Sequence, residues 1–348
     1  MGVHRRLSQA LITLLCAVSP FLAQANPEIS GAGATFPLPV IKVWAEQYQS
    51  LKNITVNYQG IGSAEGIKRI TARSVDFGVT DIGLTQSELI HDDLLQFPLV
   101  VGGITPVINL PGISSGQITL SGPVLADIYL GKITRWDDRQ IQLLNPKLTL
   151  PNLPIAVIHR KDGSGTSFNF TAYLSKVSPV WNSTLGIASS LLWPVGIEAV
   201  GNEGIAKQVL SQEGAIGYVE YFYAQQFQLT TLNLINSAGK VVAPTPDSFE
   251  QDYQHSHWHH SSFYQSLIDL PGANSWPIVG ISYVLIHEDR NDREDAIQTL
   301  YFLDWVYRNG AAAAKDLAYI PVPDPELIKL ISNAMKQVKD GQGNPVLK

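Results

Sequence analysis

Short apolar runs alternate with segments of helical periodicity along most of the chain. The apolar runs that predict strands are 54–58, 77–80, 104–109, 155–159, 215–219 and 281–287. Apolar side chains recur at helical spacing in segments that separate many of these runs or follow them, and these segments include 124–130, 168–174, 204–210 and 296–307. This alternation favours an α/β fold with sheets rich in parallel strands, in which ligands bind at the loops that lead from strand to helix.

The first apolar run, 7–22, differs from the others because basic residues at 4–6 precede it and a small-x-small pattern ending at Ala25 follows it. This arrangement predicts a secretory signal peptide that is cleaved after Ala25. Cys16 lies inside it, so the mature chain would have no disulfide, thiolate nucleophile or cysteine-based zinc site. A lipoprotein that keeps Cys16 as its lipid-bearing residue is the alternative, which the bulky Leu15 before it disfavours.

Charge and length narrow the class of protein further. No later apolar run reaches the roughly eighteen residues of a membrane span, so we expect an exported mature chain without a transmembrane segment. The net charge of the whole chain is −6. Cleavage would remove Arg5 and Arg6 and no acidic residue, so the mature chain would have a net charge of −6 − 2 = −8. Nucleic acids and acidic membranes are therefore poor partners, and an anion would have to be held by local donors. The length after cleavage suits two hydrophobic cores.

Three glycine-rich turns precede helix-like segments, at 31–36, 60–63 and 160–167. Glycine lets backbone N–H groups approach a ligand, and a helix start offers unpaired donors at its positive dipole end. The third turn adds an arginine, which is a two-pronged cation. Pro37 suits the opening of the first helix, and we expect Ser63 to cap the second. Each turn alone fits an ordinary helix cap, whereas three turns facing one ligand would form an anion site.

Six motifs, in their order and spacing, resemble the periplasmic phosphate-binding proteins of bacterial phosphate ABC transporters: 31–37, 58–63, 75–78, 127–133, 162–168 and 214–221. The likeness extends from about residue 29 to the C-terminus. It implies a type II periplasmic binding protein, with two α/β lobes joined by crossing strands and the ligand in the cleft between them. The implied divisions are a signal peptide at 1–25, lobe I at 26–100 together with 281–348, and lobe II at 101–280.

The resemblance implies that both lobes contribute groups to a phosphate site. These groups are the backbone N–H of Thr35 and Phe36, the Ser63 hydroxyl, the Asp81 carboxylate, the Arg160 guanidinium, Ser164, and the N–H of Gly165 and Thr166. The hydroxyls of Thr35 and Thr166 are further candidates, and Asp162 is expected to hold the guanidinium from behind. The resemblance further implies a monomer without enzymatic activity, cofactor or metal, which delivers inorganic phosphate to a membrane permease.

Asp81 is expected to separate phosphate from sulfate. An ionised carboxylate only accepts hydrogen bonds, and phosphate at neutral pH brings an O–H group whereas sulfate does not. Sulfate would therefore leave a buried oxygen unsatisfied. Taken without the resemblance, Asp81 fits a turn or helix cap after the strand that ends at Thr80, and Arg160 fits a simple ion pair with Asp162.

Glu65 departs from the family pattern, in which Ser or Gly is common near this position. In the first turn of a helix, Glu65 would compete with a bound anion if it pointed inward and would cost little if it pointed to solvent.

Two rival functions remain. One is a receptor for sulfate or another oxyanion, which Asp81 disfavours, and the other is a secreted hydrolase of phosphate esters. A hydrolase needs a nucleophile or metals. The Gly-x-Ser-x-Gly pattern at 112–116 lacks the strand-to-helix context of a nucleophile elbow. His255, His257, His259 and His260 could bind a metal, although an exposed loop is the expected structure.

Overall fold

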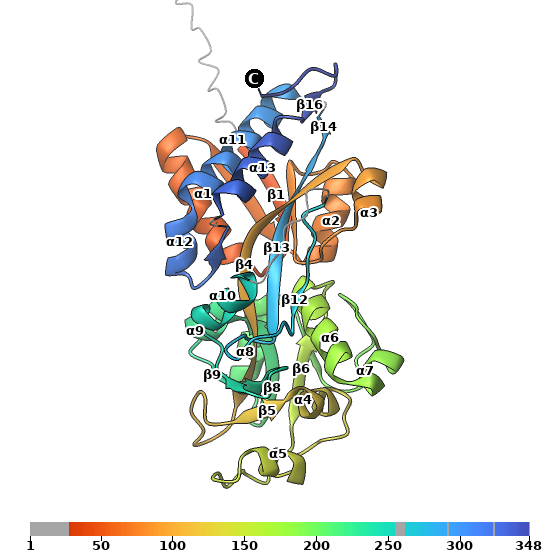
Figure 1. The fold of residues 1–348 in the computed structure, drawn as a ribbon, viewed down its shortest axis with the longest axis vertical. Coiled ribbons are helices and arrows are strands. Elements are labelled where there is room, and N and C mark those ends of the chain that lie inside the picture. The colour runs from red at the N-terminus through yellow and green to blue at the C-terminus, as the bar shows by residue number, and fades with distance from the viewer. Residues whose placement is uncertain (1–27, 255–261, 291, 323, 348) are drawn as a thin grey trace, which may run out of the picture.

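The computed structural model describes residues 28–254, 262–290, 292–322 and 324–347. Figure 1 shows two α/β halves stacked along the long axis of the molecule, with the strands β4 (Leu94–Asn109) and β13 (Ile278–His287) running between them. The expected signal peptide at 1–25 and the cluster His255–His260 lie outside the described residues. No helix within the described ranges is long and apolar enough to cross a bilayer.

One half combines the N-terminal elements with the C-terminal ones. Its elements are β1 (Glu28–Gly33), α1 (Leu38–Lys52), β2 (Thr55–Gly60), α2 (Ser63–Thr71), β3 (Phe77–Thr80), α3 (Gln86–His91), β14 (Asp289–Arg290), α11 (Arg293–Asn309), α12 (Ala311–Asp316), β15 (Ile320–Pro321), α13 (Pro325–Met335) and β16 (Lys339–Asp340). Pro37 stands at the start of α1, whose face of Val40, Ile41, Trp44 and Tyr48 is buried. We call this part half A.

The middle of the chain forms half B. Its elements are β5 (Thr119–Ser121), α4 (Gly122–Tyr129), α5 (Arg139–Leu144), β6 (Ala156–Arg160), α6 (Gly165–Val177), α7 (Pro179–Thr184), β7 (Ile197–Ala199), α8 (Gly201–Ser211), β8 (Ala215–Glu220), α9 (Tyr221–Gln226), β9 (Thr230–Thr231), β10 (Asn233–Ile235), β11 (Val241–Val242), α10 (Pro246–Gln254) and β12 (Leu267–Ile268). Each of the ten predicted runs overlaps a strand or helix of the predicted type.

A single curled sheet passes through both halves in the order β2-β1-β3-β13-β4-β8-β6-β7. The pairs at its two ends, β2-β1-β3 and β8-β6-β7, are parallel. The central pairs are antiparallel, because β13 pairs with β3 and β4, and β4 pairs with β8. The prediction of a parallel-rich sheet is therefore wrong at the centre, where the strands that link the halves run in opposite directions.

β4 changes partner along its length and so belongs to both halves. Leu94 to Gly103 lie beside β13, and Ile104 to Asn109 lie beside β8. The predicted lobe boundaries at 100/101 and 280/281 fall inside β4 and β13 rather than in loops. The assignment of lobe I to 26–100 plus 281–348 and of lobe II to 101–280 remains our proposal.

Candidate functional site

The loop from β1 to α1 brings Thr35 and Phe36 to the junction of the two halves. Gly33 has a φ of 145°, and a Cβ atom there would lie 1.9 Å from the carbonyl oxygen of Val79. Only glycine allows β1 to approach β3 so closely before the chain turns. Hydroxyl groups then hold the loop, since Tyr223 donates to the Thr35 carbonyl at 2.7 Å and Tyr319 lies 2.7 Å from that of Phe36.

Ser63 begins α2, but it does not cap that helix. Gly62, with a φ of 98°, occupies the N-cap position, and no side chain makes a capping hydrogen bond there. The Ser63 hydroxyl instead accepts a hydrogen bond from the backbone N–H of Asp81 at 3.1 Å and lies 3.3 Å from Asp81 Oδ2. The prediction of Ser63 as a helix cap is wrong, because its hydroxyl is engaged by the loop that follows β3.

Asp81 is a buried carboxyl at the end of β3. Ser282 of β13 donates to its Oδ1 atom at 2.6 Å. Burial raises the pKa of Asp81 to about 7, although hydrogen bonds from Ser282 and Ser63 and the charge of Arg160 act in the opposite direction. Asp81 is not a helix cap, because the next helix, α3, is capped by Thr85.

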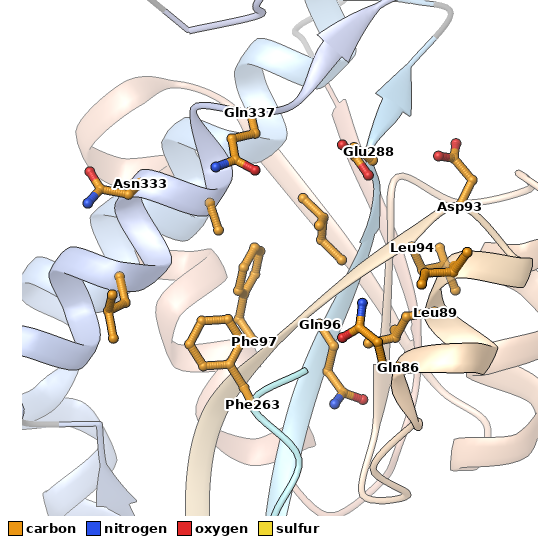
Figure 2. Close-up of a pocket in the computed structure, with 14 residues that line it drawn as sticks. Gln86, Leu89, Asp93, Leu94, Gln96, Phe97, Phe263, Glu288, Asn333 and Gln337 are labelled. Carbon is orange, nitrogen blue, oxygen red and sulfur yellow. The ribbon is translucent and has the colours of Figure 1, made fainter. Parts of the chain in front are cut away.

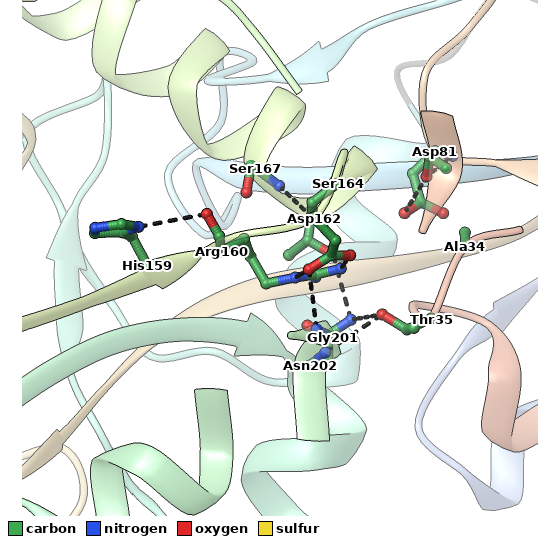
Figure 3. Close-up of polar contacts among 12 residues, drawn as sticks. Ala34, Thr35, Asp81, His159, Arg160, Asp162, Ser164, Ser167, Gly201 and Asn202 are labelled. Atoms are coloured by element: carbon green, nitrogen blue, oxygen red, sulfur yellow. Dashed lines mark hydrogen bonds and ion pairs between the residues drawn. The ribbon is translucent and has the colours of Figure 1, made fainter. Parts of the chain in front are cut away.

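Arg160 ends β6 and pairs with Asp162. Its Nε donates to Asp162 Oδ1 at 2.8 Å, and its Nη2 bonds the second carboxylate oxygen. Burial alone would raise the pKa of Asp162, but the hydrogen bonds and charge of Arg160 hold it below its usual value. Figure 3 shows the Arg160 side chain beside Asp162 near Gly201, whose N–H also donates to Asp162 at 3.0 Å.

The ion pair leaves part of the guanidinium available. Arg160 Nη1 is buried and has no hydrogen-bond partner among the residues that the structure describes. A buried donor of this kind costs free energy unless an acceptor satisfies it. The simple ion pair therefore accounts for only part of Arg160, and the role of Asp162 in fixing the guanidinium for a ligand stays a prediction.

The first turn of α6 lies against Ser63 and Asp81 of the other half. Ser164 is the N-cap of α6, and its hydroxyl accepts from the Ser167 N–H at 3.0 Å. A Cβ atom on Gly165 would lie 2.4 Å from Ser63 Oγ and 2.5 Å from Asp81 Cβ. The N–H groups at the start of this 13-residue helix thus face the same junction as the first two loops.

Direct contacts join the halves around these residues. The Ala64 N–H donates to the Gly163 carbonyl at 3.1 Å, and Asn169 Nδ2 donates to the Asp81 carbonyl at 2.9 Å. Asn202 Nδ2 donates to Thr35 Oγ1 at 3.0 Å. All eight predicted ligand residues therefore meet at one buried junction.

Sequence reasoning missed three residues there, Asn169, Asn202 and Ser282. Ser282 had a signal, because it is a polar residue inside the apolar run 281–287. Asn202 also had one, since it follows a glycine immediately before a helical pattern, as in the three turns that were recognised. Asn169 lies inside a helical pattern, and nothing in its surroundings marks it.

Glu65 points away from the junction. Its carboxylate lies 3.3 Å from Lys68 Nζ and 3.4 Å from Arg69 Nε along α2. Hydrogen bonds with Lys68 and then Arg69 lower the pKa of Glu65. This is the orientation for which we expect little competition between Glu65 and an anion.

A pocket of about 460 Å³ lies away from this junction in half A, between α3, β4 and α13. Figure 2 shows Phe97 and Phe263 at its apolar side and Gln86, Asn333 and Gln337 among its polar lining. None of the predicted ligand residues lines it. Within the described ranges, no group of three or more His, Cys, Asp or Glu side chains is placed to hold a metal ion.

A two-lobed fold with convergent donors at the lobe junction defines the class of solute-binding proteins, and the profile of the PBP superfamily domain matches residues 22–309. The phosphate-binding protein PstS of Haemophilus influenzae is 45% identical over 305 residues, covering 87% of this chain and 91% of its own. PstS of Pasteurella multocida is 41% identical over 334 residues, covering 96% and 97%. The chain therefore belongs to the PstS family of phosphate-binding proteins.

A solved structure is similar as well. The phosphate-binding protein of Stenotrophomonas maltophilia superposes with a TM-score of 0.64 at 19% identity, covering 88% of this chain and 93% of that one. This similarity shows a shared fold. The predicted family and the two-lobed α/β fold are confirmed.

Proposed function

We propose that the protein binds inorganic phosphate between its lobes, outside the cytoplasmic membrane, and delivers it to the permease of an ABC importer. Membership in the PstS family supports this function. The observation that carries it is that one buried junction holds both a donor without a partner, Arg160 Nη1, and the carboxyl group of Asp81. An anion that brings its own proton satisfies both groups.

The proposed ligands are the eight predicted from the resemblance, namely Thr35, Phe36, Ser63, Asp81, Arg160, Ser164, Gly165 and Thr166. Charge-assisted hydrogen bonds contribute about 1.5–3 kcal/mol each, and micromolar binding needs about 8 kcal/mol. Several such bonds therefore exceed the requirement, and the difference is offset by dehydration of the ion and ordering of the lobes.

The proposal includes export and a partner in the membrane. We infer that the signal at 1–25 directs the chain to the periplasm, where the mature protein acts as a monomer. The intact mass of the exported protein tests cleavage after Ala25, and a mass that retains these residues would contradict it.

We propose that the protein is a receptor and has no phosphatase activity. The purified protein, assayed with a generic phosphomonoester with and without added zinc, should release no phosphate above the buffer rate. Measurable turnover in either condition would favour the hydrolase.

Titration calorimetry with phosphate, sulfate and arsenate tests the binding function. We expect phosphate to bind at micromolar affinity or better and sulfate much more weakly. Arg160→Ala should weaken phosphate binding at least tenfold, because the variant loses the free guanidinium donor. Arg139→Ala, which removes an exposed arginine of α5, is the control and should bind as the parent does. Unchanged affinity in Arg160→Ala would remove Arg160 from the site.

A further inference from the structure

Asn202 lies in the first turn of α8, is fully buried, and contacts threonines from both halves. Its Nδ2 donates to Thr35 Oγ1 at 3.0 Å and to Thr166 Oγ1 at 3.3 Å (Figure 3 shows the bond to Thr35). We propose that Asn202 is a positioning residue that fixes both threonine hydroxyls as donors to the bound anion and couples anion binding to lobe closure. This inference rests on the proposed function and deepens it.

The orientation of the Asn202 amide is fixed from the side away from the threonines. The backbone N–H of Glu220, at the end of β8, donates to Asn202 Oδ1 at 3.0 Å. Since the amide oxygen accepts this bond, the amide nitrogen faces the threonines. The nitrogen carries two protons, one for each hydroxyl.

These bonds determine the direction in which the hydroxyls donate. A threonine hydroxyl has two lone pairs and one proton. Thr35 Oγ1 accepts from Asn202 Nδ2 and also from the Asn202 backbone N–H at 3.3 Å, so both lone pairs are engaged. Only its proton is left for a ligand. Thr166 Oγ1 accepts one bond from the same amide, which leaves its proton available too.

The two serine hydroxyls of the site also accept hydrogen bonds, in both cases from backbone N–H groups. Ser63 Oγ accepts from the Asp81 N–H, and Ser164 Oγ accepts from the Ser167 N–H. All four hydroxyls therefore accept from an N–H group. The Ser63 hydroxyl donates its proton to Asp81 Oδ2 at 3.3 Å, whereas the other three hydroxyls keep a proton for a ligand. Asp81 supplies the acceptor. The site therefore favours an oxyanion that accepts several hydrogen bonds and carries at least one proton.

Asn202 also connects the halves. Thr35 belongs to half A, whereas Asn202 and Thr166 belong to half B. The amide contacts both hydroxyls only when the halves are together. The two hydroxyls therefore become oriented in the same step in which the halves close.

A double-mutant cycle measured by calorimetry with inorganic phosphate tests this role. Asn202→Ala should weaken binding about tenfold in the parent. In a Thr35→Val/Thr166→Val background the same change should alter the affinity less than twofold, because the hydroxyls through which Asn202 acts are gone. Asn169→Ala is the matched comparison, since Asn169 also bridges the halves but contacts no hydroxyl of the site. Asn169→Ala should reduce the phosphate affinity by the same factor in both backgrounds.

A second variant covers the case in which Asn202→Ala does not fold. Asn202→Asp keeps the shape of the side chain but presents a carboxylate oxygen to the threonines. This oxygen accepts hydrogen bonds from the two hydroxyls, which are then unable to donate to the ligand. It should bind phosphate more weakly than the parent by at least a hundredfold while its melting temperature without phosphate stays close to the parent's. Parent-like affinity in Asn202→Asp, or equal losses for Asn202→Ala in both backgrounds, would overturn the positioning role. Failure of the parent itself to bind phosphate would instead refute the proposed function.

Discussion

At the scale of single residues, Asp81 carries the selectivity that we propose. Ser282 donates to one of its oxygens at 2.6 Å, and the Ser63 hydroxyl lies 3.3 Å from the other. Burial raises its pKa to about 7, so near neutral pH both protonation states of the carboxyl are populated. The ionised form accepts a hydrogen bond from the O–H group of phosphate. The protonated form is able to donate to an anion that has no proton of its own.

This titration predicts a pH-dependent preference. As the pH falls from 8 to 6, through the raised pKa, the protonated fraction of Asp81 grows, and sulfate binding should strengthen roughly tenfold. Asp81→Asn should narrow the phosphate-over-sulfate ratio at least tenfold and remove most of the pH dependence for sulfate. Calorimetry with both anions at the two pH values measures this. A ratio that stays as wide in the variant as in the parent would show that Asp81 is not the discriminating acceptor.

At the scale of secondary-structure elements, close approach of backbones decides where glycine is required. The starts of α2 and α6 meet across the junction, where a Cβ atom on Gly62 would lie 2.8 Å from the Gly163 carbonyl oxygen. A Cβ atom on Gly165 would lie within 2.6 Å of Ser63 and Asp81 atoms. These glycines allow the N-termini of α2 and α6 to approach each other at the junction.

The sequence predicts these elements better than their pairing. The run 77–80 is fully buried and coincides with β3, because such a strand is apolar on both faces. The first part of β4 was not predicted, since Gln96, Pro98 and two glycines interrupt its apolar pattern. The antiparallel partners β4 and β13 are far apart in the chain, as are Asn202 and Thr35. Local patterns hold no information on such contacts, and only the family resemblance brought the site residues together.

Gly165→Ala tests the element-level account. The added methyl would lie 2.4 Å from Ser63 Oγ, so it should hold the halves apart and weaken phosphate binding at least tenfold. The melting temperature without phosphate should change little, because separation of the lobes relieves the clash. Gly204→Ala in α8 is the control, since its nearest neighbours would be 3.7 Å away. Equal affinities in the two variants would contradict a tight junction at α6.

At the scale of the whole molecule, two halves share one sheet. β4 and β13 run through both halves, so the lobes remain connected at the sheet while their loops meet at the junction (Figure 1). In the structure the loops are in contact, through Ala64 with Gly163 and Asn169 with Asp81. We propose that this closed arrangement is the one that holds phosphate, and that delivery to the permease requires the junction to open.

A crystal structure of the protein grown with phosphate tests the central claim most directly. The account predicts one phosphate ion between the halves, with Arg160 Nη1 donating to it and an Asp81 oxygen accepting from it. It also predicts that the hydroxyls of Thr35 and Thr166 contact the ion while both stay bonded to Asn202. An ion seated at another place, or lobes that close on phosphate without contact from Arg160 and Asp81, would contradict the account.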